Sequence, residues 1–278
     1  MNYEINVVVT GAFTLKAGRK TSRWWRCFRG ASSPSQRIIC LPHAGGSASF
    51  FRNWAELLPE SVELLAVQYP GHEDRYSEPF VSDIGSLVGA LADEMITCGI
   101  TDIPYLIFGH SMGGYIAWEL ALELRKRGAQ LPYRLVVSAC EAPSMRAPGN
   151  WHSAGDEKLI EEINRLFTHR QPVAPGSEIA GLILPVIRND YRLIETWIPS
   201  TGRQPLRTAI TAFYAEDDSE MCRRQALAWE LETSGEFRCR SWNGGHFYLI
   251  EHRQEVVESL MEMARAEICR SMQKIMLP

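Results

Sequence analysis

The sequence predicts an α/β fold, in which a mostly parallel central sheet is flanked by helices. Short runs of apolar and β-branched residues recur along the chain with few polar side chains among them, as strands buried on both faces of a parallel sheet require. Helical segments lie between these runs and can supply the crossover connections of parallel strands. With 278 residues, of which 45% are hydrophobic, the chain can bury one large core.

The expected strands follow one another with helical spacing between them. Six are expected, at Arg37–Leu41, Val62–Gln68, Pro104–Phe108, Arg134–Ser138, Thr208–Tyr214 and Phe237–Arg240. A helix that packs on the sheet is expected from the three-and-four spacing of Val81, Ile84, Leu87, Val88, Leu91 and Met95.

The segment from about 142 to 206 interrupts this alternation, because it contains no convincing strand. Amphipathic helices are expected at Asp156–Phe167, Ser177–Ile187 and Asp190–Trp197, joined by prolines. A helical insertion before the last strands is typical of a lid, which excludes water and shapes a substrate pocket. Inert packing is the alternative interpretation.

A serine between glycines follows one strand directly, at Gly109-His110-Ser111-Met112-Gly113, and the helix-like Tyr115–Leu120 comes next. A sharp strand-to-helix turn strains its central residue, and only residues without Cβ can crowd against it. The first amides of the helix then lie where an oxyanion forms. This context makes Ser111 a candidate nucleophile.

Such a serine needs a base and an orienting acid, which follow in the chain order Ser, Asp or Glu, His. Four histidines lie beyond Ser111: His152, His169, His246 and His252. His246 occupies the turn between the last strand and a C-terminal helix, the usual loop for the base, whereas surface positions are the usual interpretation of the other three.

The acid should close the strand Thr208–Tyr214, where Glu216, Asp217 and Asp218 are adjacent. At least two of these carboxylates must be solvated loop residues, so the position of the acid stays open on this pattern. The oxyanion hole has two expected donors: the amide of Met112, after the nucleophile, and the amide of Ala44, in the glycine-containing loop after the strand Arg37–Leu41.

Four motifs in this order resemble the type II thioesterases that accompany nonribosomal peptide and polyketide synthases. They are Leu41-Pro42-His43-Ala44-Gly45-Gly46-Ser47, Gln68-Tyr69-Pro70-Gly71-His72, Gly109-His110-Ser111-Met112-Gly113-Gly114 and Gly244-Gly245-His246-Phe247-Tyr248. The likeness extends from about Trp24 to about Met263, and it implies an α/β-hydrolase fold. The family also resembles the medium-chain thioesterases of fatty acid synthesis.

The resemblance selects Asp218 as the acid, because the family's aspartate is the fourth residue of a Gly-x-x-Asp stretch, which is Ala215-Glu216-Asp217-Asp218 here. Ala215 replaces the glycine of that stretch and keeps Asp217 as an alternative. His72 stands where the family usually carries arginine. Nothing in the family accounts for the N-terminal extension.

The resemblance implies hydrolysis of acyl thioesters from the phosphopantetheine arms of acyl or peptidyl carrier proteins, an editing role in antibiotic or siderophore synthesis. Ser111 would attack, His246 would move the proton, Asp218 would orient His246, and the amides of Ala44 and Met112 would hold the oxyanion. No bound cofactor and no metal are expected. The alternatives are a medium-chain fatty acyl thioesterase, a small-molecule esterase, and a carrier-protein-binding module without activity.

The charge pattern indicates what kind of partner the protein binds. Residues 16–52 carry basic but no acidic side chains, although the whole chain has a net charge of −4. This basic segment indicates either a solvated tail or a docking surface for an acidic carrier protein. Its basic residues are Lys16, Arg19, Lys20, Arg23, Arg26, Arg29, Arg37 and Arg52. Without a recognition fold, nucleic-acid binding is not expected.

Seven cysteines without a Cys-x-x-Cys pair, and no apolar stretch of about 20 residues, favour a cytoplasmic protein without a membrane span. A monomer is expected. Residues 1–30 are expected to be a basic extension, and residues 31–278 the catalytic domain with its insertion at about 142–206.

Overall fold

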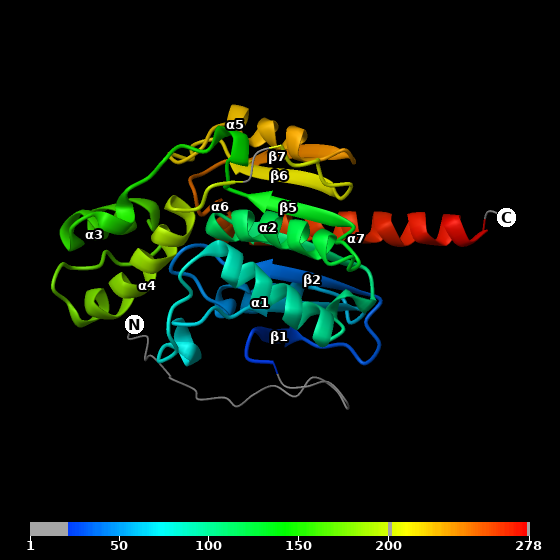
Figure 1. Cartoon of the computed structure of the whole chain (residues 1–278), viewed down its shortest axis with the longest axis horizontal. Helices are drawn as coiled ribbons and strands as arrows, with labels where there is room; N and C mark the ends of the chain where they lie inside the picture. The colour runs from blue at the N-terminus through cyan, green and yellow to red at the C-terminus, as the bar shows by residue number, and fades with distance from the viewer. Residues whose placement is uncertain (1–21, 200–201, 277–278) are drawn as a thin grey trace.

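Seven strands form one sheet in the computed structural model, which describes residues 22–199 and 202–276 (Figure 1). The spatial order is β1-β3-β2-β4-β5-β6-β7, and every neighbouring pair except β1 and β3 is parallel. The strands are β1 (Trp25–Arg29), β2 (Gln36–Leu41), β3 (Val62–Val67), β4 (Tyr105–His110), β5 (Arg134–Ser138), β6 (Ala209–Ala215) and β7 (Phe237–Trp242). The mostly parallel sheet and the six expected strands are confirmed, with ends that differ by one or two residues.

The additional strand, β1, lies inside residues 1–30, which the sequence predicts to be a basic extension. It pairs antiparallel with β3, and Trp25 packs in the main core with 5% of its surface exposed. An edge strand such as β1 obtains its structure from the neighbouring strand, so its own residues need no continuous apolar run. Residues 1–21, with Lys16, Arg19 and Lys20, lie outside the described part of the chain.

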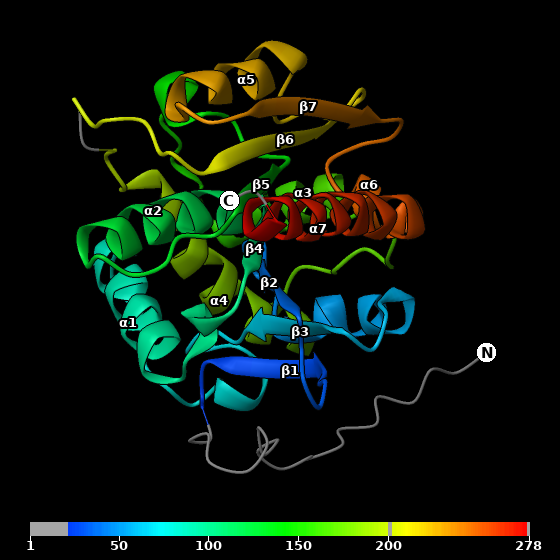
Figure 2. The ribbon, with the colours of Figure 1, turned by 90° about the vertical axis from the view of Figure 1, so that its right-hand side faces the viewer.

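Helices cover both faces of the sheet. Helices α1 and α2 lie on one face and α7 lies on the other (Figures 1 and 2). The helices are α1 (Ile84–Thr97), α2 (Met112–Lys126), α3 (Asp156–Leu166), α4 (Glu178–Glu195), α5 (Arg223–Leu227), α6 (Tyr248–Glu251) and α7 (Arg253–Met276). The interior strands β2 to β6 are buried along their whole length, which explains why most of their residues are apolar. Among the described residues, no helix combines the length and the apolar character that a membrane span requires.

Helices α3 and α4 form the insertion between β5 and β6, beyond the carboxyl ends of the parallel strands (Figure 1). They bury a small apolar cluster of their own, which includes Leu159, Ile163, Leu184 and Ile187. We call residues 142–206, outside the gap at 200–201, the α3–α4 insertion.

The expectation of two separate helices at Ser177–Ile187 and Asp190–Trp197 is wrong, because α4 is continuous from Glu178 to Glu195. Pro185 lies inside α4 on its exposed side, where the carbonyl that loses its donor can meet water. The buried face of α4 packs on α3 and keeps the helix intact through this position.

Candidate active site

Ser111 stands at the turn between β4 and α2, in a backbone conformation that residues with side chains rarely adopt. Its φ is 53° and its ψ is −119°, and its N–H donates to the Ser138 carbonyl at 2.7 Å. A Cβ on Gly109 would lie 2.1 Å from the Gly113 carbonyl oxygen, and a Cβ on Gly113 would lie 2.1 Å from that of Leu41. The two glycines are therefore required by close backbone contact around the strained serine.

His246 and Asp218 meet at the same end of the sheet. His246 lies in the loop after β7, and its Nδ1 is 3.0 and 3.2 Å from the two carboxylate oxygens of Asp218, which follows β6. The Asp218 side chain is fully buried, and the His246 side chain is 6% exposed. Because a carboxylate only accepts hydrogen bonds, Nδ1 carries a proton, and in the neutral ring Nε2 keeps its lone pair.

The neighbouring carboxylates face elsewhere. Glu216 and Asp217 are exposed, and the Glu216 carboxylate accepts from the Tyr214 hydroxyl at 3.3 Å. The Asp217 backbone N–H donates to the Gly244 carbonyl at 3.1 Å, which ties the acidic loop to the loop of His246. Of the three adjacent acids, the structure therefore brings Asp218 to His246.

The other downstream histidines pair with glutamates. The distance from the histidine Nδ1 to the glutamate carboxylate is 2.5 Å in the pair His152–Glu195, 3.6 Å in His169–Glu251 and 2.9 Å in His252–Glu255. Each of these side chains is about a quarter exposed, which agrees with the interpretation of these residues as surface histidines.

The loop after β2 lies beside the start of α2. The close approach of Gly113 to Leu41 and Pro42 joins the two segments, so the Ala44 loop and Met112 share one end of the sheet. Met112 is the first residue of α2, and its N–H is one of those that have no acceptor inside a helix. The Gly46 N–H donates to the His43 carbonyl at 2.9 Å and closes a tight turn around Ala44.

Two further histidines, His43 and His110, surround this site, although the sequence analysis gave them no role. The His110 ring lies 5.8 Å from the His43 ring and 5.3 Å from the His246 ring. Burial, with a smaller contribution from the charge of His246, lowers the pKa of His43 to about 3 and the pKa of His110 well below its usual value. Both rings are therefore neutral neighbours of His246, a property that depends on burial and has no local signature in the sequence.

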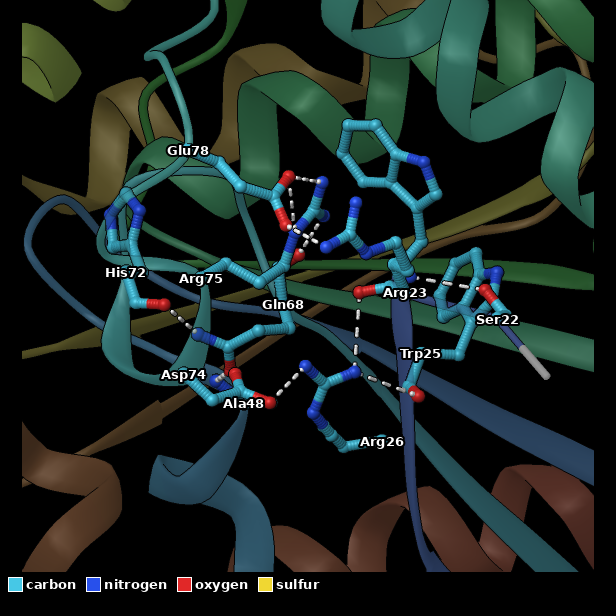
Figure 3. Close-up of polar contacts among 11 residues, drawn as sticks. Ser22, Arg23, Trp25, Arg26, Ala48, Gln68, His72, Asp74, Arg75 and Glu78 are labelled. Atoms are coloured by element: carbon cyan, nitrogen blue, oxygen red, sulfur yellow. Dashed lines mark hydrogen bonds and ion pairs between the residues drawn. The ribbon is translucent and has the colours of Figure 1, made fainter. Parts of the chain in front are cut away.

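The basic segment is partly neutralised by acidic side chains from η2, the short helix Glu73–Arg75, and the loop after it (Figure 3). Arg23 pairs with Glu78 at 3.3 Å, and Arg26 pairs with Asp74 at 2.5 Å. Arg37 is wholly buried against Glu63 and so is not available to a docking partner. Arg23, with its side chain 79% exposed, remains accessible.

Among residues 22–199 and 202–276, no group of three or more His, Cys, Asp or Glu side chains is placed so that it could bind a metal ion.

Comparisons with known proteins match most of the chain. A thioesterase domain profile matches residues 36–264. The chain is 35% identical over 235 residues to a "Probable cadicidin biosynthesis thioesterase" of Streptomyces griseus, covering 84% of this chain and 64% of the relative's length. It is 34% identical to "Thioesterase PikA5" of Streptomyces venezuelae, covering 86% of this chain and 84% of the relative. The solved structure of the "type II thioesterase BorB from the borrelidin biosynthetic cluster" superimposes with a TM-score of 0.79 at 38% identity, covering 86% of this chain and 96% of the other.

Proposed function

Because the chain belongs to the thioesterase domain family, we propose that it hydrolyses acyl thioesters on the phosphopantetheine arms of carrier proteins through an acyl-serine intermediate. Ser111 is the proposed nucleophile, His246 the base and Asp218 the residue that orients His246. The backbone N–H groups of Ala44 and Met112 are the proposed oxyanion donors.

In the proposed acylation, the Ser111 hydroxyl oxygen attacks the thioester carbonyl carbon while His246 Nε2 takes the hydroxyl proton. The carbonyl oxygen becomes an oxyanion between the Ala44 and Met112 amides. When the tetrahedral intermediate collapses, the C–S bond breaks and His246 returns the proton to the departing sulfur. Water then attacks the acyl-serine with the same base, which releases a carboxylic acid and restores Ser111.

The observation that carries this proposal is the strained conformation of Ser111 between β4 and α2. Ser111→Ala is expected to lower turnover of a simple acyl thioester by about 10³-fold or more and to leave thermal unfolding nearly unchanged. Ser82→Ala is the matched control, because Ser82 is an exposed serine that bonds only its neighbour Asp83 among the described contacts. Retention of more than about a tenth of wild-type turnover by Ser111→Ala would contradict the assignment. A wild-type protein that binds carrier protein but hydrolyses nothing would identify a binding module.

The proposed substrate class is supported by the relatives, which include a thioesterase named for cadicidin biosynthesis and a type II thioesterase from the borrelidin biosynthetic cluster. We propose an editing role, in which the enzyme removes aberrant acyl groups from stalled carrier proteins. Turnover should be compared for short and medium acyl chains, each offered on a carrier protein and on free coenzyme A. A preference for medium fatty acyl chains on coenzyme A would favour a fatty acyl thioesterase instead.

For the carrier partner, we propose that the exposed part of the basic segment attracts its acidic surface. The preference for acyl-carrier over acyl-coenzyme A should shrink as salt is added, since exposed charges are screened. Replacing Arg23, Arg26 and Arg29 together with Gln should reduce that preference. Arg23 is exposed, whereas Arg26 and Arg29 are half-buried. The control for the loss of three positive charges replaces three exposed arginines elsewhere, Arg224, Arg253 and Arg265. Equal effects of the two triple variants would assign the preference to net charge alone.

The α3–α4 insertion is proposed to act as a lid over the acyl pocket. It has an apolar cluster of its own, and its two ends are joined by Arg146, which donates to the Trp197 carbonyl at 3.0 Å. A monomeric, cytoplasmic enzyme stays a prediction, which size-exclusion chromatography and cell fractionation would check.

A further inference from the structure

His72 is held by two acceptors inside the protein. Its Nδ1 lies 3.0 Å from the Pro70 carbonyl oxygen, and its Nε2 lies 2.9 Å from Oδ2 of Asp190. The side chains of His72 and Asp190 are 3% and 1% exposed. A carbonyl oxygen and a carboxylate accept but do not donate, so both bonds form together only when both ring nitrogens carry protons. The geometry therefore suits an imidazolium cation.

Asp190 also holds the loop beside Ala44. The same oxygen, Oδ2, accepts from the Gly45 backbone N–H at 2.7 Å. Ile187, one turn earlier on α4, lies against the same glycine, since a Cβ placed on Gly45 would be 2.5 Å from Ile187 Cγ1. Gly45 has a φ of 73°, which suits glycine. Two side chains on one face of α4 thus hold Gly45 from the insertion side.

We propose that Asp190 and His72 are positioning residues, which hold Gly45 and thereby keep the adjacent Ala44 amide aimed at the oxyanion. This inference rests on the proposed function, in which Ala44 is an oxyanion donor. It links α4 to the catalytic loop, so that the insertion and the oxyanion hole are arranged as one unit. It also makes that arrangement depend on the His72 proton.

The surroundings of His72 set the direction of this dependence. Burial lowers the pKa of His72, but the Asp190 carboxylate, the bond to Pro70 and the charge of Glu73 together raise it above the usual value. Tyr69 and His43 are the other titratable groups around it; burial raises the pKa of Tyr69 and lowers that of His43 to about 3, so both stay neutral near pH 7. His72 therefore keeps its proton to a higher pH than an ordinary histidine, and the His72–Asp190 ion pair is lost as pH rises through the folded-state pKa of His72.

The decisive experiment measures kcat and KM for wild type, Asp190→Asn and His72→Arg on one acyl thioester. Asp190→Asn is expected to lower kcat by about tenfold with KM changed less than about twofold, because a misplaced oxyanion donor weakens only the transition state. His72→Arg replaces a titrating cation by a permanent one. The ratio of kcat near pH 9.5 to kcat near pH 6 should therefore be higher in His72→Arg than in wild type.

The matched control is His152→Arg, because His152 forms another histidine–carboxylate pair on the α3–α4 insertion, with Glu195, away from Gly45. Its ratio of kcat at the two pH values should equal that of wild type. Thermal unfolding identifies any variant that fails to fold, and if Asp190→Asn does so, the ratio in His72→Arg decides the question alone.

Two failures are distinguishable. If wild type shows no turnover and no acyl-Ser111 by mass spectrometry, the proposed function is overturned and this inference with it. If wild type turns over thioester while Asp190→Asn keeps its kcat, or His72→Arg keeps the wild-type ratio of kcat at the two pH values, the inference alone is overturned.

Discussion

Replacing Asp218 by Asn tests which of two adjacent acids serves His246. The Asp218 carboxylate lies 3.0 Å from His246 Nδ1 and has no exposed surface. Unit charges at that separation interact by about 5 kcal/mol at an effective dielectric constant of about 20, and this attraction exists only when His246 becomes a cation during the reaction. Asn keeps the shape and one possible acceptor but loses the charge. We therefore expect kcat to fall by about 10²- to 10⁴-fold, or about 3 to 5 kcal/mol in the activation barrier.

Asp217→Asn is the matched control for this change. The Asp217 side chain is exposed, and its backbone N–H bond to the Gly244 carbonyl is kept by Asn. Its kcat should fall by less than about tenfold, because surface changes of this kind alter little. Both variants keep Ser111 and His246, so turnover of one thioester compares them directly, and thermal unfolding checks that both are folded.

The ranking of the two variants decides the assignment. If Asp217→Asn were the damaging change, Asp217 would orient His246 in solution. If both effects were mild, neither carboxylate would support the base, and the buried contact between Asp218 and His246 would have a structural role.

Three further predictions concern stability. Gly113→Ala should prevent folding or lower the free energy of unfolding by about 3 kcal/mol or more, since its Cβ would overlap the Leu41 carbonyl. Gly181→Ala is the control, because Gly181 has open space around it, and thermal unfolding should show a neutral or stabilising effect. The free energy of unfolding of the wild type should fall as pH drops from about 6.5 towards 3, because His43 binds a proton more readily in the unfolded chain than in the folded protein. In urea titrations at several pH values, His43→Phe should reduce this dependence of the unfolding free energy on pH. Glu63→Gln should cost about 3 kcal/mol in urea unfolding, since it leaves the wholly buried Arg37 without its counter-charge; a cost below about 1 kcal/mol would contradict this.

The core of the fold was predictable because its signals are local. Interior strands such as β2 and β4 are buried on both faces, so each contains a short apolar run that stands out in the sequence, Ile38–Leu41 and Tyr105–Phe108. The turn at Ser111 carries its own signature, because only glycine fits beside it.

Other elements had no local signal. Strand β1 contains charged residues and is ordered by pairing with β3 at the sheet edge. Asp190 was expected near the start of a helix, yet it lies inside α4 and its carboxylate faces Gly45 and His72. Such roles depend on residues far away in the chain.

The sequence by itself therefore predicted six of the seven strands, Ser111 and His246 as candidate nucleophile and base, and the reaction class that the motifs imply. Only the tertiary structure decided which acid reaches His246 without help from family resemblance, which histidines are buried and neutral, and how α4 contacts the Ala44 loop. The physical reason is the separation along the chain of the residues that interact. Strand and turn preferences act between near neighbours in the sequence, whereas burial, charge pairing and hydrogen-bond partners depend on segments that meet only in the folded protein.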